Sequence, residues 1–161
     1  MKRLTPQWYD TPVSEKEFNT IQSKLRYCLP NSYKKLVLEY DALVPVECIF
    51  EFVNVYGEND ERDLNFLSFK PEHLDGDIIS NQKNVSNVDD YGLEGIIVFG
   101  ICGNGDYVCF DYRKDAQSCD PGILLLYHDD FVKNAEGTET MVVNEVANNF
   151  EEFLEKLHPM D

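Results

Sequence analysis

The first forty residues carry apolar side chains at the spacing of two amphipathic helices. Ser14 and Glu17 have the spacing of a capping box, which starts the first helix, and Pro30 suits the first turn of the second. The apolar stripes behind these starts are Phe18, Ile21, Leu25 and then Tyr33, Leu36, Val37, Tyr40. The pattern predicts one helix over 14–25 and another over 30–40.

The apolar period changes to two after residue 43, which is typical of strands. The segment 43–56 alternates apolar and polar side chains and predicts a strand that ends at Gly57. The sequence ENDERD (58–63) then indicates an acidic loop, and FLSF (66–69) a short strand. The polar stretch 80–92 is interpreted as a loop that contains at most a short helix.

The segment GIIVFGICGNGDYVCFDYR (95–113) has the pattern of a β-hairpin. Two runs of β-branched and aromatic residues flank an Asn-Gly pair, a dipeptide that favours tight turns between antiparallel strands. The apolar run 122–128 predicts a further, buried strand. A final helix is predicted from the apolar residues Val146, Phe150, Phe153, Leu154 and Leu157, which precede Pro159.

This order of elements predicts one α+β domain over residues 1–161, with a sheet of about five strands and a C-terminal helix on one face. We find no repeat, linker or low-complexity tract. The chain also lacks the apolar stretch of a signal peptide or of a membrane helix, so a cytosolic protein is expected.

The glycines of the hairpin could either hold a phosphate or turn the chain. Their spacing matches neither a P-loop nor a dinucleotide-binding fingerprint, and Asp106 places a carboxylate where a phosphate needs a positive partner. We therefore interpret the connection as a structural turn, formed by Gly103, Asn104, Gly105 and Asp106.

Cysteine chemistry is expected to be structural. The five cysteines are an odd number, contain no C-x-x-C pair and lie mostly in apolar strand-like segments. Buried thiols are favoured over a disulfide framework or a zinc site.

Charge is the outlying property of the composition. The formal net charge is −16, and it is unevenly distributed: residues 1–40 carry seven basic and four acidic side chains, and residues 41–161 carry seven and twenty-six. Such a surface repels nucleic acid and anionic lipid, and it accelerates encounter with a basic protein. Solubility alone is the simpler explanation of the same charge.

Motifs for catalysis are absent from the chain. We find no G-x-S-x-G, H-E-x-x-H or C-x-x-C pattern, and the sequence predicts neither an enzyme nor a bound cofactor. The acidic residues near the hairpin leave one metal hypothesis open, because carboxylates and a histidine could hold a cation if they converged. Its candidate ligands are Asp106, Asp111, His128, Asp129 and Asp130.

Four segments together resemble the SMI1/KNR4 family, also called the SUKH superfamily. They are LPNSYKKLVLEY (29–40), GIIVFGICGNGDYVCFDYR (95–113), PGILLLYHDD (121–130) and VANNFEEFLEKL (146–157). The resemblance implies helices packed on a mixed, largely antiparallel, bent sheet of about five to six strands. It also implies a non-enzymatic protein-binding domain, since bacterial members are known chiefly as immunity proteins that neutralise toxins, nucleases among them. Fungal members act as scaffolds and regulators of cell-wall signalling.

We therefore predict an acidic surface that binds a basic toxin domain. The predicted contact residues are Tyr56, Glu58, Asp60, Glu61, Asp63, Asp89, Asp90, Tyr91, Tyr127, Asp129 and Asp130. Ordinary solvated loops are the alternative for each of them, because few residues dominate an interface. A scaffold domain and a metal-dependent hydrolase are the competing functions, and the sequence does not decide whether the chain forms a homo-oligomer.

Overall fold

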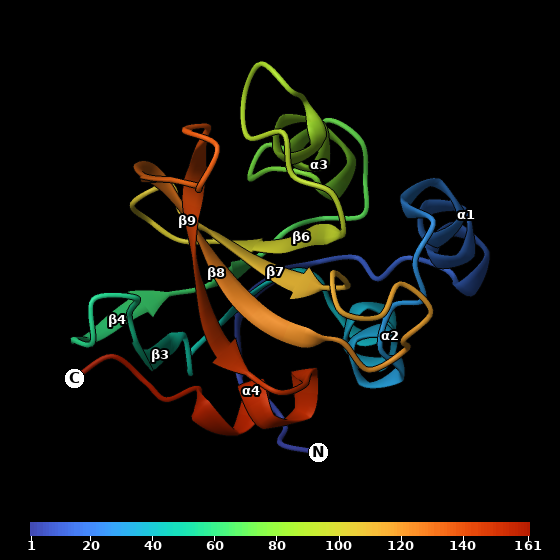
Figure 1. Cartoon of the computed structure of the whole chain (residues 1–161). Helices are drawn as coiled ribbons and strands as arrows, with labels where there is room; N and C mark the ends of the chain where they lie inside the picture. Colours follow the sequence, from blue (N-terminus) through green and yellow to red (C-terminus); the bar gives the residue numbers. More distant parts are fainter.

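The computed structural model describes all residues from 1 to 161 (Figure 1). Four helices and nine strands follow one another along the chain. In order they are β1 (Pro6–Asp10), α1 (Glu15–Leu25), α2 (Asn31–Glu39), β2 (Asp41–Pro45), β3 (Ile49–Val53), β4 (Asn59–Asp63), β5 (Asn65–Phe66), α3 (Ile78–Ser86), β6 (Ile96–Ile101), β7 (Tyr107–Asp111), β8 (Gly122–Lys133), β9 (Glu139–Ala147) and α4 (Phe150–Lys156).

The centre of the molecule is a five-stranded meander in the order β5-β6-β7-β8-β9. Two separate two-stranded sheets lie beside it: β1-β2, whose strands are joined through α1 and α2, and the β3-β4 hairpin. Every named strand pair is antiparallel, so the α+β prediction is confirmed while the mixed sheet is not. Strands that follow one another in the sequence pair with each other, β5 and β6 through a connection that contains α3, which leaves no parallel crossover in this sheet.

The two N-terminal helices form as their sequence pattern predicts. The Ser14 side chain accepts a hydrogen bond from the Glu17 backbone, and the Glu17 carboxylate accepts one from the Ser14 N–H. This reciprocal capping fixes the start of α1, and α2 starts directly after Pro30. Both helices bury their predicted apolar stripes in the common core, except Tyr40, which follows the end of α2 and is half-buried.

Aromatic rings from distant elements make the core that holds the helices on the sheet. Tyr33 of α2 is fully buried, and its ring centroid lies 5.1 Å from that of Phe110 and 5.4 Å from that of Phe150. Phe99 of β6 stacks on Phe110 at 4.3 Å. The core therefore connects α2, the central strands and α4.

Several element boundaries differ from the sequence prediction. The acidic segment 58–63 is mostly strand β4 and not a loop, and the single strand over 43–56 is two strands, β2 and β3, separated by a break. The loop over 80–92 begins inside helix α3, while β1 and β9 were not predicted. Helix α4 starts only at Phe150, and Val146 belongs to strand β9.

The cysteine prediction is wrong for one pair. Cys28 and Cys119 form a disulfide with 4.8 Å between their Cα atoms, although 91 residues separate them in the sequence. The fold brings the α1-α2 connection onto the β7-β8 connection, where Tyr112 also donates a hydrogen bond to the Cys28 carbonyl at 2.5 Å. The other three cysteines are free; Cys102 and Cys109 are buried, as expected.

None of the four helices is long and apolar enough to cross a membrane.

Candidate protein-binding surface

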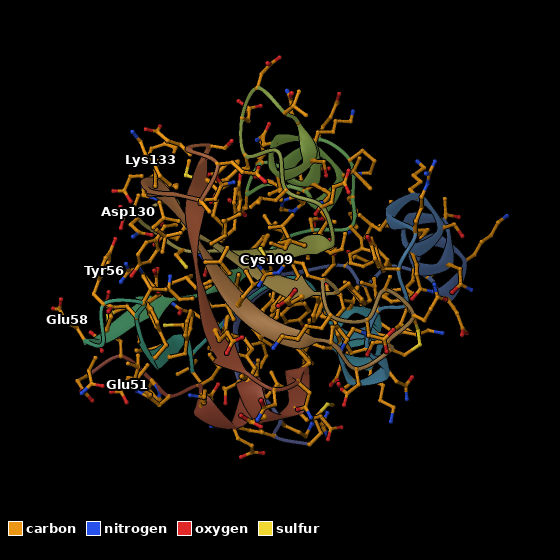
Figure 2. All side chains as sticks on the ribbon, in the orientation of Figure 1. Glu51, Tyr56, Glu58, Cys109, Asp130 and Lys133 are labelled. Atoms are coloured by element: carbon orange, nitrogen blue, oxygen red, sulfur yellow. A yellow bond between two sulfur atoms is a disulfide. The ribbon has the colours of Figure 1, made fainter.

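Eight of the predicted contact residues meet where the β3-β4 hairpin lies beside β8. Figure 2 shows Tyr56, Glu58 and Asp130 on this side of the molecule. The Tyr56 hydroxyl donates to the Asp130 carboxylate at 2.5 Å, so the hairpin turn and β8 are in direct contact. We call this group the acidic pole; its residues are Tyr56, Glu58, Asp60, Glu61, Asp63, Tyr127, Asp129 and Asp130.

A buried carboxylate, Asp106, organises the acidic pole from beneath. Its Oδ2 accepts hydrogen bonds from Arg62 Nε at 2.9 Å and from Asn104 Nδ2 at 3.0 Å. Its Oδ1 accepts the His128 backbone N–H at 3.1 Å and lies 2.5 Å from His128 Nδ1. Asp106 thereby joins β4, the β6-β7 turn and β8, the three segments that carry the pole.

The lowered pKa of Asp106 agrees with its position among hydrogen-bond donors. Burial alone would raise the pKa of Asp106, but hydrogen bonds from Arg62, His128 and Asn104 outweigh it and hold the pKa below its usual value. Arg62 also binds Asp60 at 2.9 Å, and its guanidinium lies over the Tyr127 ring at 5.4 Å. The one arginine of β4 is thus used internally, and the outward-facing charge of the strand is negative.

The predicted turn residues occupy the β6-β7 connection. Gly105 has a φ of +100°, a conformation that favours glycine, and the Gly103 N–H donates to Asp63 at 2.9 Å. The glycines therefore turn the chain and attach it to β4, while Asp106 faces the interior.

Two of the three tyrosines among the predicted contact residues are too buried to contact a partner with most of their ring. Tyr127 is only 6% exposed, because Arg62 covers it. Tyr91 is half-buried against Tyr107, with 5.9 Å between the ring centroids, and burial raises its pKa to about 12. Of the three tyrosines only Tyr56, at 57% exposure, is an exposed side chain.

Asp89 and Asp90 lie apart from the pole, in the turn that follows α3. Both are exposed, and neither side chain forms a hydrogen bond or ion pair with β4 or β8. The sequence prediction therefore combined two separate groups of residues, and the larger group lies where the β3-β4 hairpin meets β8.

The metal hypothesis loses two of its five ligands, Asp111 and Asp130, the second of which accepts the Tyr56 hydroxyl. Asp106, His128 and Asp129 do converge, with potential ligand atoms within 4.8 Å of one another, but Asp111 lies at the opposite end of β7 and binds Arg113. Both Asp106 oxygens already accept hydrogen bonds from Arg62, Asn104 and His128. A cation would have to displace these donors.

A second group of potential ligands is also internally satisfied. His73 Nε2 lies 3.0 Å from Asp10, and Asp41 accepts hydrogen bonds from Ser68 and from the Phe69 N–H. These contacts join the β1-β2 sheet to the segment after β5. Their role in the fold is therefore structural.

Sequence reasoning missed the apolar residues next to the acidic pole. Val53 is 60% exposed and Phe131 is 52% exposed. The alternation along β3 could have identified Val53, because this residue occupies an outward-facing position of the strand. Phe131 lies in the part of β8 beyond the predicted strand end at 128.

The comparison with protein families agrees with the architecture described above. The model of the SMI1 / KNR4 family (SUKH-1) matches residues 12–156, from just before α1 to the end of α4. No curated protein matches the chain. Because the match covers all but the two ends of a chain with this α+β arrangement, the protein belongs to the SMI1/KNR4 family (SUKH-1).

Proposed function

We propose that this protein is an immunity protein, which binds and neutralises a basic toxin domain without catalysing a reaction. The acidic pole is the observation that carries the proposal. It gathers carboxylates from β4, the β3-β4 turn and β8 at one end of the molecule, while the arginine between them is held inside by Asp106. Family membership supports a protein-binding role of this kind.

The physical argument begins with the charge that such a toxin needs. A nuclease attracts a phosphate backbone with a basic face, and carboxylates can occupy the same face in place of phosphates. Opposite potentials accelerate the encounter, and a few desolvated contacts then supply affinity. The acidic pole fits this task because its carboxylates project from strands and a tight turn, which order them before binding.

A non-catalytic role is supported by how the ionisable groups near the pole are used. Asp106, Arg62 and His128 are engaged with one another, in contacts that stabilise the fold. The groups left free are exposed carboxylates, which suit recognition of a basic partner.

The cytosolic location stays a prediction. Disulfides are rare in reducing compartments, so the Cys28–Cys119 pair weighs against it. In the cytosol we expect the two cysteines to be thiols, and in an oxidising compartment a disulfide.

The test uses the purified product of the gene adjacent to the one that encodes this chain. We expect it to be basic, to bind with an association rate that falls between about 50 mM and about 300 mM salt, and to lose its activity when bound. Absence of binding, or an association rate unaffected by salt, would contradict the proposal. Binding that leaves the partner fully active would instead support the scaffold function.

A further inference from the structure

An apolar strip runs along the acidic pole. Val53, Val55, Tyr56 and Phe131 are each more than half exposed, which is unusual for four large apolar side chains close together on a chain of this charge. We define the apolar strip as Val53, Val55, Tyr56, Phe131, Met141 and Val143.

Contacts between β3, β8 and β9 make the strip continuous. Val53, Val55 and Val143 line the same hollow of about 520 Å³, and the Val55 N–H donates to Asn144 of β9 at 3.0 Å. Met141 lies two residues before Val143 and therefore on the same face of β9.

The strip continues from β9 to β8 and back to the hairpin turn. Phe131 pairs directly with Met141 across the two strands, which places their side chains on one face. At this end, the Tyr56 hydroxyl donates to Asp130, the residue before Phe131, so Tyr56 lies against β8 next to the strip.

Carboxylates lie beside the apolar strip, and one of its basic neighbours, Arg113, is paired with an aspartate. Glu51, Glu58 and Asp130 lie along the same side of the molecule in Figure 2. Lys133 lies opposite Glu139 in the register of the β8-β9 hairpin, and Arg113, which also lines the hollow, is held by Asp111. An apolar centre within a charged rim is the usual anatomy of a protein interface.

The charge of the rim selects one kind of occupant. A second copy of this chain would bring another net charge of −16 to the same negative surface, and nucleic acid would be repelled in the same way. A basic protein surface with apolar side chains at its centre is complementary in both charge and polarity.

We infer that the apolar strip is the energetic centre of the interface and that its occupant is the apolar centre of a basic protein domain. The inference rests on the proposed function and assigns separate tasks within it. The carboxylates set the rate of encounter, whereas the strip sets how long the complex lasts, since desolvated apolar contacts mainly control dissociation.

The test compares variants of the strip in binding to the purified adjacent-gene product. We expect Phe131→Ala to weaken binding about tenfold and the combination with Val55→Ala about 30- to 100-fold. The loss should appear in the dissociation rate, with the association rate changed less than about threefold. Thermal melting checks that the variants remain folded, which we expect because the substituted side chains are exposed.

Trp8→Ala is the matched control, because Trp8 is a similarly exposed aromatic residue at 45% and lies on β1, outside the strip. It should leave the affinity unchanged. Binding that the strip variants do not weaken would overturn this inference alone. Absence of binding by the wild-type chain would overturn the proposed function and the inference with it.

Sedimentation of the chain by itself completes the experiment. We expect a monomer at the concentrations used for binding. A dimer that Phe131→Ala dissociates would overturn the assigned occupant, since the strip would then be an interface between two copies.

Discussion

Asp106 shows how one buried carboxylate can hold an exposed acidic surface in place. It is 1% exposed and binds Arg62, Asn104 and His128, which come from three different segments. Without it Arg62 would keep Asp60 as its ionic partner, and β4 and β8 would lose the buried carboxylate that connects them. Asp106 is therefore a positioning residue for the acidic pole.

We predict that Asp106→Asn lowers the free energy of unfolding by about 3–5 kcal/mol at pH 7, the cost of breaking a buried ion pair. Because the folded-state pKa of Asp106 is lowered, its stabilising contribution is fully present above the unfolded-state pKa of about 3.9 and is lost as pH falls through the folded value. Urea denaturation should show the largest difference between wild type and variant at neutral pH, and a shrinking one below about pH 4.

Asp89→Asn is the control for that measurement, since Asp89 is exposed and its side chain has no ion-pair partner. It should change stability by less than about 0.5 kcal/mol. An equal effect of the two substitutions would show that Asp106 contributes only its charge.

Tyr33 combines a central packing position with an unsatisfied polar atom. Its ring packs against Phe99, Phe110 and Phe150, but its buried hydroxyl has no hydrogen-bond partner in the chain. Burial raises the pKa of Tyr33 well above its ordinary value. We have no structural reason for the hydroxyl.

We predict that Tyr33→Phe is neutral or stabilises the protein by about 1 kcal/mol, because it removes an unpaired buried polar group and keeps the ring. Tyr112→Phe is the comparison, since the Tyr112 hydroxyl donates to Cys28 and its loss should destabilise by about 1 kcal/mol. Thermal denaturation measures both, and a clearly destabilised Tyr33→Phe would show that the hydroxyl has a partner in solution.

The disulfide joins the loop between α1 and α2 to the loop between β7 and β8. Cys28 follows α1, and Cys119 lies in the segment between β7 and β8. Stacking of Tyr27 on Tyr112, with 4.5 Å between centroids, joins the same two regions. The link therefore attaches the helical layer to the central strands.

Because the link closes a loop of 91 residues, we predict that Cys119→Ser lowers the free energy of unfolding by about 2–5 kcal/mol under oxidising conditions. Denaturation with and without reductant measures the effect. Reductant should destabilise the wild type by the same amount as the substitution, and it should not destabilise the variant further. Cys48→Ser, which changes a free cysteine, should leave the response to reductant intact.

Charge is segregated along the whole molecule. The chain up to residue 40, which carries the net positive charge, includes α1 and α2 at the right of Figure 1, whereas β3 and β4 lie at the left. The molecule therefore has a permanent charge asymmetry that turns its acidic pole toward a basic partner as the two approach. This orientation adds to the effect of net charge alone.

We predict that the combined substitution of Glu58→Gln, Glu61→Gln and Asp129→Asn slows association with the adjacent-gene product about tenfold at low salt. It should also reduce the dependence of the rate on salt, because the steering charges are removed. Stopped-flow mixing over a series of salt concentrations measures both effects.

The matched control changes the same number of charges elsewhere. Glu94, Glu151 and Glu155 are exposed and form no ion pair, and their replacement by Gln gives the same net charge. Similar rates for the two triple variants would mean that net charge matters and the position of the pole does not.

The sequence by itself determined the elements whose signals are local. The Ser14–Glu17 capping box, the apolar stripe behind it and the Asn104–Gly105 turn depend on neighbouring residues, and the structure has α1 and the β6-β7 hairpin where these signals lie. The four family segments likewise identified the family before any contact was known. The sequence also determined the net negative charge, since this depends only on the number of acidic and basic residues.

Only the tertiary structure decided which distant residues meet. The β3-β4 pairing turned an acidic loop prediction into a strand, because polar side chains can form an exposed edge strand when a partner supplies the backbone hydrogen bonds. The same long-range packing paired Cys28 with Cys119, buried Tyr127 beneath Arg62 and placed Phe131 beside Met141. Such contacts depend on how the chain folds back on itself, and local sequence carries no direct record of them.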